Sequence, residues 1–386
     1  MDAAELFETI SSGETSLVQF KREFDNADNI AAEMIAFANA KGGMIILGVE
    51  DKTGDVVGLE SAELRIIGNK LASVANDLVK PQINFTTEVV KIDTKNVLLV
   101  CVDEGASKPY KDNNGAIWIK RGPDKKRLTD NSEIVRIFQQ GGLLYVDEVG
   151  VKNTSAEDID TVKVRDYLKR VLADSGGGEW VLNDVLYQNL GIIKKTQLTL
   201  GGLLFFAKDP QRYAPPFHVK AVSFYGNSIG GSHYRDSRDL TGTIPEMFMG
   251  SMLFFKLNLQ QVQGGQNFNS IGILEISEIA LEELVQNALI HRDYTKNAPV
   301  RLMIFDDRVE IISPGCLPNG LTVENIKMGN AVLRNNLLAS YASKTLKYRG
   351  LGSGVIRAME EQPNIELIND ESGNQFIVKI PREAKA

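Results

Sequence analysis

Three polar side chains able to support chemistry recur at a spacing of four residues in the last third of the chain. Glu283, Asn287 and His291 are separated by apolar residues that include Leu284 and Ala288. An α-helix places residues four apart on one face, so the acid, the amide and the imidazole are expected to form one stripe. A carboxylate can activate water, and an amide oxygen can bind Mg²⁺. A solvated helix face is the alternative interpretation of this spacing.

Two glycine-containing motifs follow this stripe in the sequence. Ser313-Pro-Gly315 comes directly after a predicted strand, and Gly350-Leu-Gly352-Ser-Gly354 opens a predicted helix. Glycines at the start of a helix let backbone amides approach phosphate groups closely. Because glycines also form ordinary turns, this second motif is weak evidence alone, and its place after the acid and amide stripe gives it weight.

Together with segments 306–315 and 374–381, these motifs resemble the ordered boxes of the GHKL ATP-binding fold. They resemble more closely the divergent histidine-kinase-type ATPase domain of bacterial and archaeal proteins labelled RecG-like or transcriptional regulators. The resemblance begins near residue 195 and ends at 381. It implies that ATP or a related nucleotide binds with Mg²⁺, that Glu283 is the catalytic, water-activating carboxylate, and that Asn287 is the metal ligand. The cofactor-binding residues that it implies are Asn287, His291, Ser313, Gly315, Gly350, Gly352 and Gly354. For His291, packing at the helix end is the alternative to a contact with the terminal phosphate.

One motif departs from that family. The Asp-x-Gly-x-Gly motif of active GHKL enzymes, whose carboxylate reads the adenine amino group, is replaced by Ser-Pro-Gly-Cys-Leu at 313–317. Glu310 and Asp306 are the carboxylates considered as substitutes. A weak ATPase activity therefore stays open, and a non-catalytic scaffold is one alternative. The sequence has no Walker A motif, which argues against a P-loop motor.

A second resemblance covers about residues 11–140. The segments 13–21 and 36–51 are similar to the Schlafen-type AlbA-like domain. Some Schlafen proteins cut RNA with three carboxylates that bind a divalent metal, and the matching positions here are Glu14, Gln19 and Asp51. Since Gln19 is a neutral amide, it contributes less charge to such a site. The resemblance favours nucleic-acid binding, and a metal-dependent RNA endonuclease with Glu14 and Asp51 as catalytic residues, for example in defence, is the second alternative.

Basic residues gather in one segment of an otherwise acidic chain. The formal net charge is −7, yet residues 105–127 hold seven Lys and Arg against two Asp. Such clustering is typical of a phosphate-binding surface, where Tyr110 and Trp118 could stack on unpaired bases unless they belong to the core. The expected DNA or RNA contacts are Lys21, Arg22, Lys108, Lys111, Lys120, Arg121, Lys125, Lys126 and Arg127.

The helices and strands expected from the sequence, which must position these residues, indicate an α/β protein. The chain length indicates two or three domains. We expect an AlbA-like nucleic-acid-binding domain over 1–148, a mixed connecting α/β region over 149–270 and a GHKL-like α/β sandwich over 271–386. In the last of these, a helix over 277–291 should lie with other helices on one face of a sheet.

The remaining features concern the cellular setting. No apolar run of about 18 residues occurs and the N-terminus is acidic, so a cytoplasmic protein without membrane contact is expected. Cys101 and Cys316 should be buried thiols, and no histidine or cysteine spacing indicates zinc. We predict a homo-oligomeric, nucleotide-responsive DNA- or RNA-binding regulator, for instance of transcription. In it, nucleotide binding would order a loop over 319–349.

Overall fold

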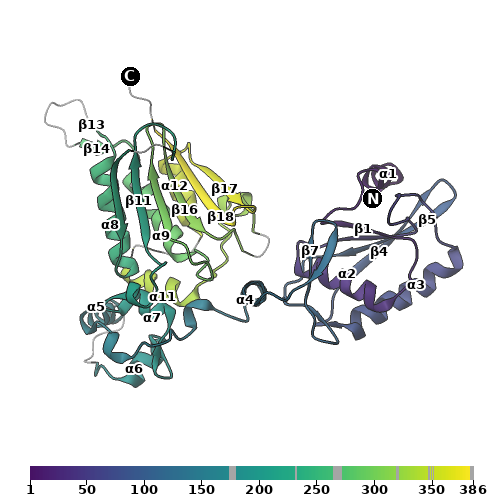
Figure 1. Ribbon diagram of the computed structural model, residues 1–386, viewed down its shortest axis with the longest axis horizontal. Helices are drawn as coiled ribbons and strands as arrows, with labels where there is room; N and C mark the ends of the chain where they lie inside the picture. The colour runs from purple at the N-terminus through teal and green to yellow at the C-terminus, as the bar shows by residue number, and fades with distance from the viewer. Residues whose placement is uncertain are drawn as a thin grey trace. The chain divides into compact units, whose positions relative to one another are not determined.

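The computed structural model describes residues 1–173, 180–230, 233–263, 272–318, 321–346, 348, 350 and 352–382. It divides into two compact units, Met1–Leu144 and Tyr145–Ala386, which are described separately (Figure 1). Both units combine helices with sheets, which confirms the α/β fold class. Among the described helices, none combines the length and the apolar composition that crossing a membrane requires.

The first unit is built on a four-stranded sheet of order β1-β2-β5-β4, in which only the β1/β2 pair is parallel. Apolar side chains of two helices and of the sheet form the larger core on one face, and the N-terminal helix packs through Leu6 and Ile10 on the other face. The elements are α1 (Ala3–Ser11), β1 (Val18–Lys21), α2 (Ala27–Asn39), β2 (Gly43–Leu47), α3 (Ser61–Ser73), β3 (Val79–Lys80), β4 (Phe85–Ile92), β5 (Lys95–Val102), β6 (Lys111–Asp112), β7 (Trp118–Arg121), β8 (Asp124–Arg127) and α4 (Asn131–Gln140).

Helix α2 holds the basic segment in place. Its N-cap, Asn26, accepts hydrogen bonds from two backbone amides of the first turn. At its other end, the buried Asn39 donates to the carbonyl oxygens of Tyr110 (2.8 Å) and Trp118 (2.9 Å) and accepts from the Tyr110 amide. One side chain thus attaches the β7/β8 hairpin and the segment before it to the helix.

The second unit is built on a six-stranded sheet of order β12-β11-β15-β16-β18-β17. Helices α8, α9 and α12 cover one face of this sheet, as expected from the sequence (Figure 1). The elements are α8 (Ile244–Asn258), α9 (Glu278–Ile290), α12 (Ser353–Glu361), β11 (Val219–Phe224), β12 (Tyr234–Leu240), β15 (Val300–Ile304), β16 (Arg308–Pro314), β17 (Glu366–Asp370) and β18 (Gln375–Pro381).

The segment 149–270, expected to be a separate connecting region, contributes to this same sheet. Strand β11 pairs in parallel with β15 over five residues, and α8 packs beside α9. One continuous hydrophobic core therefore includes residues from both halves of the unit, such as Ala221 and Leu302. The boundary between the two units therefore falls at Leu144, because this strand pairing joins the segment 149–270 to the C-terminal part of the chain.

Smaller elements complete the second unit: α5 (Thr161–Ala173), α6 (Asp184–Asn189), β9 (Ile193–Lys194), β10 (Gln197–Leu198), α7 (Leu200–Phe206), β13 (Gln261–Gln263), β14 (Gly272–Leu274), α10 (Val323–Lys327) and α11 (Asn336–Thr345). The last two lie within the loop 319–349 that nucleotide was expected to order. Part of this segment is therefore helical, while positions 319, 320, 347 and 349 lie outside the described residues.

Candidate nucleotide-binding site

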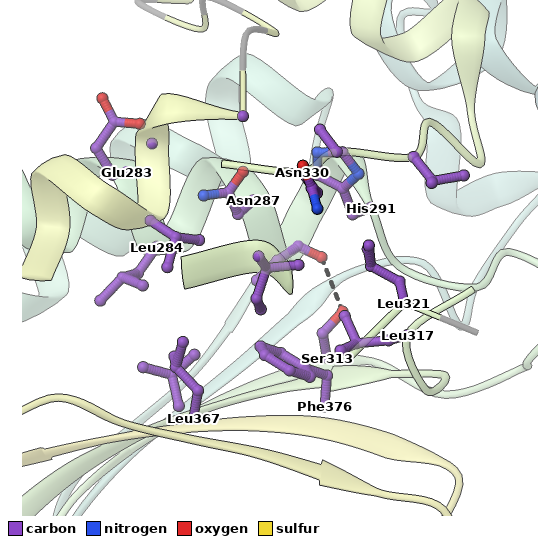
Figure 2. A pocket seen from close by; sticks show the side chains of 18 of the residues that line it. Glu283, Leu284, Asn287, His291, Ser313, Leu317, Leu321, Asn330, Leu367 and Phe376 are labelled. Atoms are coloured by element: carbon purple, nitrogen blue, oxygen red, sulfur yellow. Dashed lines mark hydrogen bonds between the residues drawn. The ribbon is translucent and has the colours of Figure 1, made fainter. Parts of the chain in front are cut away.

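Helix α9 places the predicted acid, amide and imidazole on one cavity wall. The helix begins after Ser277, whose side chain accepts from the Ala280 amide, and His291 is its C-cap. Glu283, Asn287 and His291 all line an open cavity with about 1060 Å³ of space not filled by atoms (Figure 2). The helical stripe expected from the four-residue spacing is therefore present, and it faces a cavity rather than open solvent.

The other residues singled out as cofactor-binding line the same cavity. They come from the end of β16 and from the turn before α12, far apart in the sequence: Ser313, Gly315, Gly350, Gly352 and Gly354. The fold brings these two segments together. Helix α9 packs against both β16 and α12, and β16 pairs with β18 in the same sheet.

The glycine turn brings its backbone to the acid and the amide. Gly350 and Gly352 adopt left-handed conformations, with φ of 67° and 73°. A Cβ atom at Gly354 would lie 2.5 Å from Glu283 Oε2 and 3.2 Å from Asn287 Nδ2, so a larger residue there would displace the Glu283 carboxylate. Helix α12 begins at Ser353 beside the cavity, and its first amides and dipole favour an anion there.

The polar end of the cavity holds a buried ion pair. Glu283 pairs with Arg357 of α12, and their side chains are 8% and 29% exposed. The Asn287 Nδ2 atom is buried without a hydrogen-bond partner in the described structure. A buried amide group without a hydrogen-bond partner costs free energy unless a ligand supplies that partner. Rotation of the amide by 180° exchanges the positions of its oxygen and nitrogen.

His291 and Ser313 have internal hydrogen bonds. The His291 Nε2 atom lies 2.9 Å from the hydroxyl of Tyr348. Burial and the nearby Arg334 charge lower the pKa of His291 to about 4, so its imidazole is neutral at physiological pH. Ser313 donates to the Ala288 carbonyl oxygen at 3.0 Å, the bond drawn in Figure 2. Ser313 therefore attaches β16 to α9 while it lines the cavity.

The other end of the cavity is apolar. It is lined by Ile311, Leu317, Leu367, Phe376 and Val378. Of these, Leu367 and Phe376 are seen on the sheet side of the cavity, away from Glu283 (Figure 2). Such a surface suits the flat face of a nucleobase. Cys316 also lines it as a buried free thiol, whereas Cys101, in the first unit, is a free thiol and is only partly buried.

The carboxylates considered as substitutes for the adenine-reading acid do not reach this end. Glu310 accepts from Arg308 on the same strand at 2.7 Å, and Asp306 pairs with Arg235. Among the described residues that line the cavity, Glu283 is the only carboxylate. The base end therefore lacks the acid that reads an adenine amino group in the GHKL family.

Sequence reasoning missed Asn330, Tyr348, Arg357 and Phe376, which also line the cavity. Arg357 had a usable signal, because it lies three residues after Gly354 on the helix that the glycine motif opens. The others are joined to the site only by tertiary packing.

In the first unit, the three positions matched to the Schlafen carboxylates do meet. Gln19 donates a hydrogen bond to Glu14, and the Phe20 amide donates to the same oxygen at 2.7 Å. Burial, with the Asp51 charge in addition, raises the pKa of Glu14. Two lysines supply the positive charge that a metal ion would otherwise supply to these side chains. Lys21 pairs with Asp51 at 2.6 Å, and Lys120 donates a hydrogen bond to Gln19 at 2.7 Å.

These contacts weigh against a metal-dependent nuclease site in this arrangement. Within the described part of the chain, no group of three His, Cys, Asp or Glu side chains is placed to hold a metal ion. Two ammonium groups in the same network already supply positive charge. The interpretation of Glu14 and Asp51 as catalytic residues stays a prediction that the geometry does not favour.

The predicted basic surface is smaller than the sequence suggested. Lys108 and Lys120 are 4% and 7% exposed, which corrects their expected role as surface phosphate contacts. Lys108 pairs with Glu104 at 2.5 Å, and Lys120 contacts the buried Glu33 at 3.4 Å. Lys120 turns inward because the buried Glu33 carboxylate needs a compensating charge, whereas the Glu104 partner of Lys108 is only partly buried.

The other predicted contacts divide into paired and exposed residues. Lys125 pairs with Glu33, Arg121 with Glu133 and Arg22 with Glu50. Tyr110 is buried, and Trp118 packs against the core and donates to Asp112 at 3.0 Å, so neither ring is free for base stacking in this conformation. Three exposed basic residues remain on or beside the β7/β8 hairpin: Lys111, Lys126 and Arg127.

Two families match separate parts of the chain. Residues 14–129 match the family "Schlafen, AlbA_2", and residues 297–380 match the family "Putative ATP-dependent DNA helicase recG C-terminal". An uncharacterized ATP-binding protein of Ureaplasma parvum serovar 3 is 36% identical over 152 residues, which are 38% of this chain. The match spans 34% of that relative's length, about a third.

Two solved structures are also similar. The DIP2311 protein of Corynebacterium diphtheriae is 19% identical, with a TM-score of 0.48, over 99% of this chain and 80% of its own. The N-terminal domain of a RecG-related protein from Nitrosomonas europaea is 23% identical, with a TM-score of 0.26, over 34% of this chain and 96% of its own. From the two family matches, the chain joins an N-terminal Schlafen AlbA_2 domain to a C-terminal RecG-like domain of the histidine-kinase-type ATPase family.

Proposed function

We propose that the second unit binds a nucleoside triphosphate, ATP or a related nucleotide, together with Mg²⁺. One observation carries this proposal. A single cavity has an acid and an amide beneath a glycine turn at one end and an apolar surface at the other. This pattern matches a ligand with an anionic chain and a flat base. The name of the Ureaplasma relative, an ATP-binding protein, is consistent with it.

The residues present fit a magnesium ion. The Asn287 side chain lines the cavity beside Glu283, and an amide oxygen is a suitable ligand for this cation. Asn287 would hold this ion on α9, where the ion would supply positive charge for the phosphate oxygens. The first amides of α12 would bind phosphate oxygens, and Glu283 would orient a water molecule.

A nucleotide titration tests this function. Calorimetry and thermal melting of the full chain should show Mg²⁺-dependent binding of ATP, with stabilisation of about 2.7 kcal/mol at a ligand concentration 100 times Kd. Asn287→Ala should weaken binding by about tenfold or more, as loss of a metal-site residue does. Asn189→Ala, an exposed position in α6, is the matched control and should bind normally. If no nucleotide changes either signal, the proposal is wrong and the non-catalytic scaffold is favoured.

We also infer that the first unit binds nucleic acid and that nucleotide regulates this binding. The exposed Lys111, Lys126 and Arg127 support the first part, and the pairing of the two domain families supports the second. Labelled single- and double-stranded DNA and RNA should bind with an affinity that falls with salt and changes when ATP and Mg²⁺ are added. Equal affinity with and without nucleotide would refute the regulatory part alone.

A further inference from the structure

Among the described residues that line the polar end, Arg357 is a cation that sequence reasoning did not assign. It lies on α12 about one helical turn beyond the first residue, Ser353, so its long side chain can turn back toward the helix N-terminus. Its guanidinium group lines the cavity and pairs with Glu283. A flexible cation therefore stands where the phosphate chain of the proposed nucleotide would end.

Two donors around this ion pair lack acceptors. The Arg357 Nε atom and the Asn287 Nδ2 atom are both buried without a hydrogen-bond partner in the described structure. Both belong to residues that line the cavity beside Glu283. Buried donors are almost always satisfied in proteins, so the unfilled positions indicate a missing acceptor. An anionic oxygen fits best, because a guanidinium group binds phosphate through two parallel hydrogen bonds.

We propose that Arg357 recognises the terminal phosphate of a nucleoside triphosphate, and that Glu283 holds Arg357 in that phosphate's place when no nucleotide is bound. This inference rests on the proposed nucleotide-binding function. An arriving terminal phosphate would take over the guanidinium group and separate it from Glu283. A diphosphate, which ends one group earlier, would leave the ion pair intact. The site therefore distinguishes triphosphates from diphosphates through one arginine.

The test compares the Mg²⁺ complexes of ADP and of the non-hydrolysable β,γ-imido analogue of ATP by calorimetry on the full chain. Because Arg357→Ala alone leaves a buried carboxylate uncompensated, the main comparison uses Glu283→Gln against Glu283→Gln with Arg357→Ala. Removing Arg357 in this background should weaken the triphosphate analogue at least tenfold and ADP less than threefold. Arg357→Lys should give an intermediate loss, because a lysine keeps the charge without the planar fork.

Glu283→Gln by itself provides a second readout. With its partner acid gone, Arg357 is free, so the triphosphate analogue should bind several-fold more tightly than to the wild type, while ADP should change little. Arg238→Ala, an exposed arginine of β12 that pairs with Asp236, is the matched control and should leave both affinities unchanged.

The outcomes separate the two claims. If the wild type binds both nucleotides and loss of Arg357 leaves their affinity ratio unchanged, this inference is wrong and the proposed function stands. If the wild type binds neither nucleotide, both are wrong.

Discussion

The glycine turn before α12 predicts a specific stability loss for Gly352→Ala. At φ of 73°, a residue with a Cβ costs about 1–2 kcal/mol. In addition, the new Cβ would fall well inside van der Waals contact with the Gly329 carbonyl oxygen, and it would lie 3.3 Å from the Cβ of Ala331. Displacing packed backbone of this kind costs about 1–3 kcal/mol more. The expected loss is therefore about 2–5 kcal/mol.

The control for this variant is Gly226→Ala in the same unit. Gly226 has a φ of 75°, and its Cβ would meet no atom within 4 Å, so this substitution carries the conformational cost alone. In thermal melting of the full chain, the transition of the second unit should fall by about 2–12 °C beyond that of the control, since each kcal/mol shifts Tm by about 2–4 °C in a unit of this size. Equal melting temperatures would show that the approach to Gly329 does not restrict the turn.

Three further predictions concern the site, the pH dependence and the basic segment. Gly354→Ala has no φ penalty, but its Cβ would crowd Glu283. Calorimetry should therefore show nucleotide binding weakened about tenfold, with little change in Tm. Unchanged affinity would contradict the close approach of Gly354 to Glu283. His291, whose folded pKa of about 4 lies below the unfolded value of 6.5, stays neutral when buried, so the unfolded state binds more protons between these pH values. Stability should fall by up to about 3 kcal/mol as pH drops from 6.5 to 4, and His291→Gln should remove most of that fall in urea midpoints. Lys120→Ala should lower the free energy of unfolding by about 3 kcal/mol or more, because it removes the cation of a buried ion-pair network. Lys126→Ala, at an exposed position, should change that free energy by no more than about 0.5 kcal/mol and weaken only nucleic-acid binding. Equal stability losses would refute this division.

Local patterns predicted much of the candidate site. The stripe from Glu283 to His291 follows from helical periodicity, and the helix itself was expected over 277–291 against the observed Glu278–Ile290. The glycine motif precedes and begins α12 as expected, because a residue without a Cβ can adopt the positive φ values observed at Gly350 and Gly352. Both predictions depend on short-range geometry.

Helix starts were less predictable in the middle segment. Ser155 and Asp158 have the spacing of a helix capping box, and they do form one, but only on a single 3₁₀ turn. Helix α5 begins later, at Thr161, because Ile159 pairs with Ala207 as an isolated bridge and interrupts the helix. A distant strand contact thus overrode a correct capping signal.

The sequence alone determined which residues can approach a phosphate chain. The acid and the amide one turn apart follow from helical periodicity, and the exposed backbone amides follow from the lack of a side chain in glycine. Only the tertiary structure decided how the charges are used. It turned Lys120 toward the buried Glu33 and placed Arg357 on Glu283, because the sign of a side chain is visible in a sequence while its burial and its partner depend on packing between distant segments.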